Sequence, residues 1–141
     1  MGHRRAGREC ALQMLYGRDI GGISDDEVLQ AWRAMDDFSP RVREFAEQLF
    51  TGVAARIDEL DRLIQGHAQN WRLGRMAAVD RNVLRLAAFE LIYGGNNPDS
   101  AIINEAIELA RKFSTQDSAQ FVNGILDSIR KDGAARRRSD Q

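Results

Sequence analysis

Residues 79–91 read VDRNVLRLAAFEL, and this stretch decides the fold. In the wider segment 75–93, apolar residues fall on most sides of a helix rather than along one stripe. That pattern is typical of a helix enclosed by other helices. We therefore expect the rest of the chain to pack around this segment.

The segments on either side of residues 75–93 also read as helices. Apolar spacings of three and four recur throughout the chain while period-two alternation is nearly absent, so the sequence predicts an all-α fold. Ser24, with Glu27 three residues later, is a capping box, and Ser39 precedes a proline at a first helical position. About seven helices are expected, at residues 4–18, 25–35, 40–57, 60–64, 75–93, 99–113 and 117–129. We expect them to form one domain over residues 1–133, followed by a basic, disordered tail at residues 134–141.

Length and composition set the class of protein. The chain has 141 residues, 43% of them hydrophobic and 29% charged, which fits one globular domain rather than a disordered chain. No apolar run exceeds four residues and the N-terminus lacks an apolar signal segment, so we expect a cytoplasmic protein without membrane contact. The single cysteine, Cys10, excludes an internal disulfide, and with His3 and His67 it gives too few ligands for a metal site.

The charges are distributed unevenly along the chain. Residues 1–18 hold four arginines against one glutamate, a net +3, and residues 130–141 hold five basic residues against two aspartates, again +3. Since the whole chain has a net charge of −1, the middle carries −7. Two basic ends on an acidic body indicate a polyanionic partner that binds at one place.

The sequence gives little support for catalysis. Neither histidine has a partner in the sequence pattern, and no glycine-rich loop follows a strand, so nucleotide-binding fingerprints are absent. No nucleophile is placed beside a base. We expect a protein that is not an enzyme and uses no cofactor.

The first helix carries the clearest binding signal. At 100° per residue, with Arg5 at zero, Leu12 falls at about −20°, Tyr16 at about +20° and Arg8 at about −60°, while Cys10 falls on the opposite side at about 140°. One face is then buried, and the other presents guanidinium groups beside a phenol ring. Arginine binds phosphate and an aromatic ring stacks on an unpaired base, so this face predicts nucleic-acid binding. The alternative is a solvated amphipathic helix whose tyrosine covers a neighbour.

Four segments together resemble a known family. Residues 4–16 (RRAGRECALQMLY), 79–91, 103–113 (INEAIELARKF) and 118–127 (SAQFVNGILD) are similar to the opening, central, following and last helices of the bacterial transcription antitermination family NusB. The resemblance covers residues 3–131, and between residues 21 and 74 it lies in the helix pattern more than in the residues.

The resemblance implies an all-α fold of two small packed bundles and a role without catalysis. It implies pairing with the small-subunit ribosomal protein that acts as NusE, binding of single-stranded boxA RNA from ribosomal RNA leaders, and work within the RNA polymerase antitermination complex. Asp80 matches a position that faces the protein partner. The positions that match RNA-facing residues are Arg4, Arg5, Arg8, Tyr16, Asp117 and Phe121. The chain departs from the family at Gly7, where alanine or another helix former is common, and in having only three arginines in the opening cluster, which puts RNA affinity in question.

Other interpretations of these residues stay open at this point. Phe121 starts an apolar stripe and could belong wholly to the core, and Asp117 could be an N-cap. We expect Asp80 to point outward, because an unpaired buried carboxylate is costly, with an ion pair to Arg75 or Arg85 as the alternative.

Two rival functions also remain. One is an RNA-binding accessory domain like that of ribosomal RNA cytosine methyltransferases, although 141 residues leave no room for a catalytic half. The other is a helical scaffold that binds protein only. Whether the chain forms a homodimer is not decided by the sequence.

Overall fold

Seven α-helices and one short 3-10 turn make up the described part of the chain, as the sequence predicted. The computed structural model describes residues 2–35, 37–95 and 97–139, with side chains up to residue 133, and none of these residues forms a strand. The elements are α1 (His3–Gly21), α2 (Asp25–Ala34), α3 (Pro40–Ala54), α4 (Ile57–His67), η1 (Leu73–Arg75), α5 (Ala78–Tyr93), α6 (Asp99–Phe113) and α7 (Gln116–Ser139).

Hydroxyl side chains cap the starts of α2, α3 and α7. The Ser24 and Ser39 hydroxyls accept hydrogen bonds from the backbone N–H of Glu27 and Val42, which confirms both predicted caps. The predicted cap at Asp117 is wrong. The Thr115 hydroxyl accepts instead from the Ser118 N–H at 3.0 Å, and Asp117 lies in the first turn of α7.

Several helix ends differ from the sequence-based expectation, and α5 begins at Ala78 rather than at residue 75. Helix α1 continues past residue 18 to Gly21, because Gly22 adopts the left-handed conformation (φ 63°) that caps a helix. Helix α4 begins at Ile57, which we had assigned to the preceding helix. Helix α7 continues past residue 129, where we expected it to end, and past Gly133, after which we expected a disordered tail. The expected disorder of the basic tail falls on residues whose side chains, from residue 134 onward, lie outside the described part of the chain.

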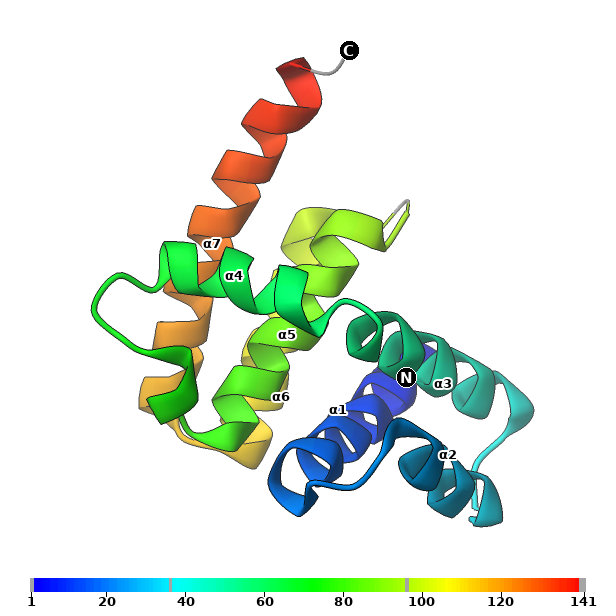
Figure 1. Cartoon of the computed structure of the whole chain (residues 1–141). Coiled ribbons are helices and arrows are strands. Elements are labelled where there is room, and N and C mark those ends of the chain that lie inside the picture. Colours follow the sequence, from blue (N-terminus) through cyan, green and yellow to red (C-terminus); the bar gives the residue numbers. More distant parts are fainter. Residues whose placement is uncertain (1, 36, 96, 140–141) are drawn as a thin grey trace.

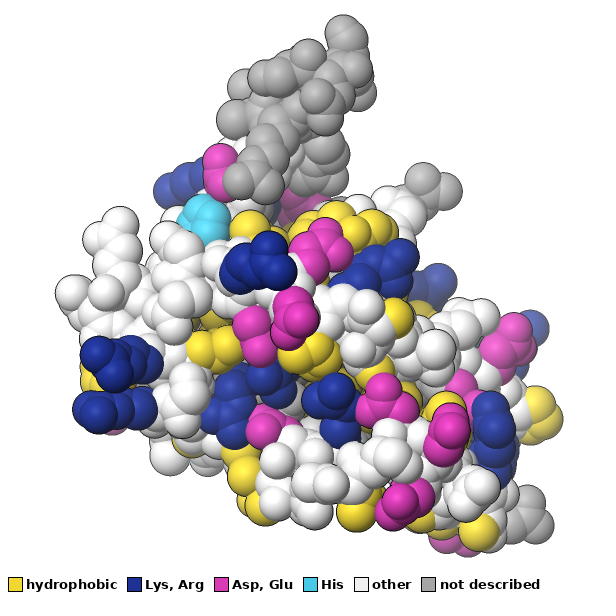
Figure 2. Space-filling model, viewed as in Figure 1, with side chains coloured by type: hydrophobic (Ala, Val, Ile, Leu, Met, Phe, Trp, Pro, Cys, Tyr) yellow, Lys and Arg dark blue, Asp and Glu magenta, His cyan; other side chains and the backbone are white. Residues whose placement is uncertain are grey.

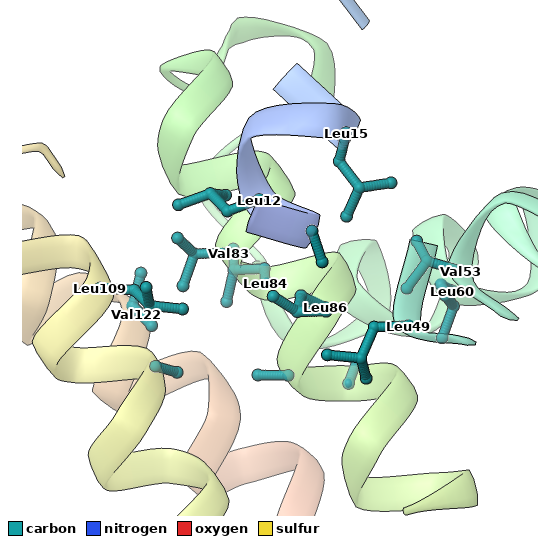
Figure 3. Close-up of a cluster of buried hydrophobic side chains, with 14 of the residues drawn as sticks. Leu12, Leu15, Leu49, Val53, Leu60, Val83, Leu84, Leu86, Leu109 and Val122 are labelled. Atoms are coloured by element: carbon teal, nitrogen blue, oxygen red, sulfur yellow. The ribbon is translucent and has the colours of Figure 1, made fainter. Parts of the chain in front are cut away.

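The helices form two packed groups that share α5 (Figure 1). Helices α1, α2 and α3 make one bundle, and α4, α5, α6 and α7 make the other. Helix α5 also packs against α1 and α3, so it belongs to the core of both groups. Figure 3 shows Val83, Leu84 and Leu86 of α5 at the centre of this core, and all three are buried. The enclosed helix predicted at residues 75–93 is therefore confirmed for residues 78–93, while residues 75–77 lie outside it.

A glycine in α1 makes room for an aromatic ring of α3. A Cβ atom at Gly7 would overlap the ring of Phe45, so only glycine lets that ring lie flat against α1. The departure at Gly7 from the family pattern thus has a packing explanation. The same ring lies under the arginines at the start of α1, which makes Phe45 part of their surroundings.

Candidate functional site

The start of α1 presents two of the three predicted arginines to solvent. Arg4 is exposed, and its guanidinium carbon lies 5.1 Å from the centre of the Phe45 ring. Arg5 is also exposed, and its side chain forms two hydrogen bonds with the carboxylate of Glu105 on α6, at 2.7 and 3.1 Å. Both side chains line a cavity of about 300 Å³ between α1 and the start of α6. The exposed positions of Arg4 and Arg5 agree with the predicted binding face.

Arg8 does not lie on this exposed face, and the prediction that it does is wrong. Its side chain is only 9% exposed and donates two hydrogen bonds to Glu90 of α5, from Nε to Oε2 at 2.8 Å and from Nη2 to Oε1 at 2.9 Å. Glu90 is itself buried. Arg8 therefore joins α1 to α5, and although it reaches the cavity lined by Arg4 and Arg5, its guanidinium group is already paired with Glu90.

The prediction that α1 has one buried face and one fully exposed face is also wrong. Leu12 was predicted on the open face beside Arg5, yet Leu12 is buried along with Cys10. Helix α1 packs against both α3 and α5, so apolar side chains on most of its circumference are covered. Tyr16, the aromatic residue predicted on this face of α1, is exposed over 42% of its surface.

Most charges around this face are paired. In the part of the chain that the structure describes, Lys112 of α6 forms an ion pair with Glu9, and Arg111 forms one with Glu108. Figure 2 shows basic and acidic side chains interspersed on the face viewed in Figure 1. The structure thus has no wide surface of a single sign in that view. At the start of α1, a phosphate would have to compete with the carboxylate of Glu105 for Arg5.

The ion pair between Arg5 and Glu105 shifts the pKa values of both side chains. The hydrogen bond from Arg5, followed by its charge, holds the pKa of Glu105 below its ordinary value, although partial burial acts in the opposite direction. The hydrogen bond and charge of Glu105 in turn raise the pKa of Arg5. Both groups are therefore charged at neutral pH.

The structure brings the other three predicted residues together in one pocket. Asp80 at the start of α5 and Asp117 and Phe121 at the start of α7 line a cavity of about 290 Å³. The sequence assigned Asp80 to a protein partner and the other two to RNA. The structure thus places the three predicted positions side by side in the lining of one pocket.

Asp80 was predicted to point outward, and this is wrong, because only 7% of its surface is exposed. Its Oδ2 accepts a hydrogen bond from the Ser118 hydroxyl at 2.9 Å. The alternative pairing with Arg85 is also wrong, because Arg85 donates to Asp61 at 2.7 and 2.9 Å and to Asp19. Phe121 is half-buried rather than wholly core, and its ring meets that of Trp71 edge to face at 5.7 Å between centres.

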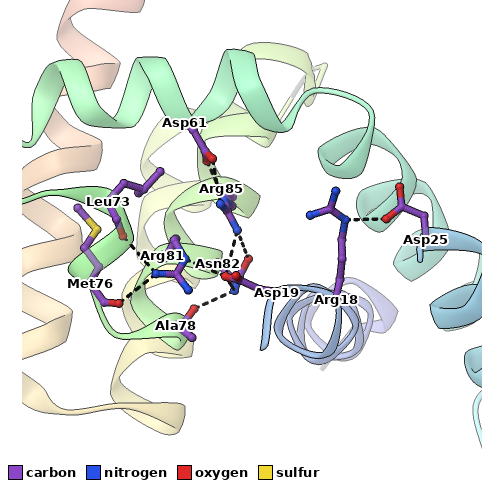
Figure 4. A network of polar contacts seen from close by, with 10 residues as sticks. All are labelled: Arg18, Asp19, Asp25, Asp61, Leu73, Met76, Ala78, Arg81, Asn82 and Arg85. Atoms are coloured by element: carbon purple, nitrogen blue, oxygen red, sulfur yellow. Dashed lines mark hydrogen bonds and ion pairs between the residues drawn. The ribbon is translucent and has the colours of Figure 1, made fainter. Parts of the chain in front are cut away.

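A buried polar network joins the end of α1 to the first turns of α5 (Figure 4). Asp19 near the end of α1 accepts hydrogen bonds from Arg81 at 2.8 Å, Asn82 at 3.0 Å and Arg85 at 3.2 Å, all from α5. Burial alone would raise the pKa of Asp19, but the hydrogen bonds and charges of these partners outweigh it and hold the pKa below the ordinary value. Arg85 continues the network to Asp61 of α4, so one cluster connects both bundles.

Several residues that shape these sites were not singled out in the sequence. Phe45 and Glu105 surround the exposed arginines, and Trp71 and Ser118 line the pocket. The signal at Trp71 was a large aromatic residue within the polar stretch Asn70–Arg72. No comparable signal marks Glu105, whose partner Arg5 lies 100 residues away in the sequence.

The described residues contain neither a metal-binding cluster nor a membrane-spanning helix. No group of three or more His, Cys, Asp or Glu side chains in this part of the chain is placed to hold a metal ion. Among the same residues, no helix combines the length and apolar character that a membrane span requires.

Comparisons with known proteins show consistent similarity along the chain. The model of the NusB family matches residues 5–131. The transcription antitermination protein NusB of Koribacter versatilis is 46% identical over 138 residues, which cover 97% of this chain and 94% of the relative. Among solved structures, NusB of T. maritima is 32% identical with a TM-score of 0.82, covering 93% of this chain and 92% of that one. The antitermination factors NusB and NusE in complex with dsRNA give a TM-score of 0.80 at 27% identity, covering 93% of this chain and 98% of that one.

Proposed function

Because this chain belongs to the NusB family of transcription antitermination proteins, we propose that it binds boxA RNA of ribosomal RNA leaders as one half of a heterodimer. The other half is the small-subunit ribosomal protein that acts as NusE, and the pair works within the RNA polymerase antitermination complex. A solved neighbour that contains NusB, NusE and dsRNA supports both partners for a fold of this kind. The curated relatives that match over most of the chain are antitermination proteins, which supports this role over that of an accessory domain in a methyltransferase.

The exposed face of α1 is the observation that carries the RNA proposal. Arg4 and Arg5 supply guanidinium groups for phosphates, and Tyr16 supplies an exposed ring on which an unpaired base can stack. Arg8 is left out of this surface because its charge is already neutralised by Glu90 inside the fold.

The arrangement also supports a role for a second protein. Two exposed arginines offer few phosphate contacts, and one of them is held by Glu105. Phosphate contacts dominate the affinity of proteins for nucleic acids, so a surface with so few binds RNA weakly by itself. We infer that the ribosomal protein supplies the remaining contacts.

Salt-dependent binding tests the assignment of this face. A fluorescein-labelled boxA RNA is titrated with the heterodimer at several salt concentrations, with Arg5→Gln and Tyr16→Ala as variants. Arg62→Gln on α4 is the control of equal charge change, since Arg62 is also exposed. Each phosphate contact to single-stranded RNA contributes about 0.7 to the slope of log K against log salt.

We expect Arg5→Gln to reduce that slope by about 0.7. Tyr16→Ala should cost about 1–3 kcal/mol through lost stacking and leave the slope unchanged. The control should match the wild type in both quantities. The proposal is contradicted if the slope of log K against log salt is the same for all variants. It is also contradicted if Arg62→Gln loses as much RNA affinity as Arg5→Gln.

A further inference from the structure

Arg5 lines two cavities whose charged residues differ. In the cavity of about 300 Å³ between α1 and the start of α6, called the basic cavity, the charged lining residues are Arg4, Arg5, Arg8 and Glu105. In the second cavity, of about 350 Å³ and called the acidic cavity, they are Arg5, Lys112, Glu9, Glu105 and Glu108. Cations outnumber carboxylates in the first lining, and carboxylates outnumber cations in the second. A phosphate group is therefore attracted to Arg5 from the basic cavity.

Glu105 is the only carboxylate among the described residues that line the basic cavity. Its Oε1 accepts a hydrogen bond from Nη2 of Arg5 at 2.7 Å, and its Oε2 accepts one from Nε of Arg5 at 3.1 Å. The Arg5 and Glu105 side chains are 47% and 24% exposed, so a ligand can reach the pair from solvent. Because Arg8 is already paired with Glu90, Glu105 offsets one of the two arginine charges that Glu90 leaves in this cavity.

From this arrangement we propose that Glu105 limits the affinity of the basic cavity for RNA by competing with phosphate for Arg5. A phosphate that takes the place of the carboxylate exchanges one charge-assisted hydrogen bond for another and gains little. A phosphate that binds beside the carboxylate is repelled by its charge. Glu105 acts through Arg5 and does not itself contact the RNA. The inference rests on the proposed function, because both take RNA as the ligand of this face.

The competition makes RNA binding depend on contacts that form elsewhere at the same time. A ligand that reaches only Arg5 does not recover the free energy lost when the ion pair with Glu105 separates. A ligand that also contacts the exposed Arg4, stacks on the exposed ring of Tyr16 or is held by a second protein does recover it. Glu105 therefore keeps this chain from binding RNA tightly by itself.

The opposite role for Glu105 would be to hold Arg5 in the orientation that a phosphate requires. The charges favour competition, because the carboxylate lines the cavity that the phosphate would enter and carries the same sign. The two roles predict opposite results when the carboxylate is replaced by an amide. Competition predicts tighter RNA binding, and orientation predicts weaker RNA binding.

Fluorescence anisotropy of a labelled boxA strand with this chain alone separates the two roles. Glu105→Gln should tighten binding about threefold or more, because an exposed ion pair is worth up to about fivefold in an equilibrium constant. Arg5→Gln should weaken binding. The double variant Arg5→Gln/Glu105→Gln should bind as Arg5→Gln does, since Glu105 acts only through Arg5. A merely structural role of Glu105 would change stability, and it would give no gain in affinity that requires Arg5.

Glu108→Gln is the matched control for Glu105→Gln. Glu108 lies one turn further along α6, is exposed, and lines the acidic cavity without lining the basic one. The substitution removes the same charge from the same helix, so it should tighten RNA binding much less. Thermal melts check that each variant is folded, and Glu105→Gln should melt close to the wild type because exposed ion pairs add little stability.

The wild-type protein offers a check that needs no substitution. The hydrogen bond from Arg5 holds the pKa of Glu105 below its ordinary value. When a phosphate takes Arg5, the pKa of Glu105 should rise, because the carboxylate loses its donor and gains a negative neighbour. The carboxyl ¹³C signal of Glu105, titrated with and without saturating RNA, measures this change. An unchanged pKa in the RNA complex would overturn the inference.

The binding measurements contradict the inference in three further cases. The first is RNA binding by folded Glu105→Gln that is no tighter than that of the wild type, while Arg5→Gln weakens binding, which would leave the proposed function intact. The second is a gain in Glu108→Gln as large as that in Glu105→Gln, which would indicate a general effect of charge. The third is a gain from Glu105→Gln that persists when Arg5 is replaced. If Arg5→Gln binds RNA as the wild type does, the proposed RNA-binding face fails together with the inference.

Discussion

Replacing Arg8 by methionine should destabilise the fold strongly, because it breaks a buried ion pair. The two hydrogen bonds between Arg8 and Glu90 measure 2.8 and 2.9 Å, and the side chains are 9% and 4% exposed. Removing one member of such a pair leaves the other as an uncompensated buried charge, at a cost of about 3–5 kcal/mol. For a domain of this size we expect the melting temperature to fall by roughly 10–15 °C.

The double variant Arg8→Met/Glu90→Leu separates the charge effect from a general loss of packing. Because both charges are removed and apolar side chains of similar volume replace them, stability should return to within about 2 kcal/mol of the wild type. Urea unfolding followed by circular dichroism at pH 7 gives the free energies of unfolding of the wild type, of Arg8→Met and of the double variant. The same double variant should bind RNA as the wild type does, since Arg8 is not part of the exposed face.

A small loss of stability in Arg8→Met would contradict a buried ion pair. If Arg8→Met costs less than about 1 kcal/mol, a value typical of exposed ion pairs, the pair is not buried in solution. A folded double variant that loses RNA affinity would contradict the structural role of Arg8 and return it to the binding face.

Three other predictions concern stability and reactivity. Gly52→Ala should cost about 1–3 kcal/mol in urea unfolding, because the added Cβ would overlap the ring of Phe89 where α3 meets α5. The lowered pKa of Asp19 means that its carboxylate stabilises the fold above its ordinary pKa of 3.8, and this contribution is lost as the pH falls through the folded-state value. Melting between pH 6 and 2 should therefore show a shallower decline for Asp19→Asn than for the wild type, and parallel curves would contradict the network. Burial raises the pKa of the Cys10 thiol, so alkylation by iodoacetamide at pH 8 should be much slower in the folded protein than in urea, and equal rates would show that the thiol is accessible.

The helices could be predicted because their signals are local. Ser24 and Ser39 cap helices within three residues of themselves, and the apolar surroundings of residues 75–93 are visible in that segment alone. The ends at Gly21 and at residues 55–57 were less well predicted, since a glycine conformation and a short turn decide them. Fold class followed from these signals, and the family followed from four matching segments.

The candidate site was harder to predict, because burial of a charge depends on partners far away in the sequence. Arg8 fits the periodicity of an exposed face, yet Glu90, 82 residues later, neutralises it inside the core. Asp80 looked like an exposed rim residue, yet Ser118, 38 residues later, supplies a hydrogen bond that makes its burial tolerable. Helical periodicity places a side chain on a face of its own helix, and only the tertiary packing decides whether that face is covered.

Binding of boxA RNA with and without the ribosomal protein tests the central claim most directly. Fluorescence anisotropy of a labelled boxA strand gives the dissociation constant of this chain alone and of its mixture with the partner at the same salt concentration. Because α1 alone offers few phosphate contacts, we expect weak binding that tightens at least tenfold, about 1.4 kcal/mol, when the partner is present. Equal affinity in the two titrations would contradict a function that depends on the heterodimer.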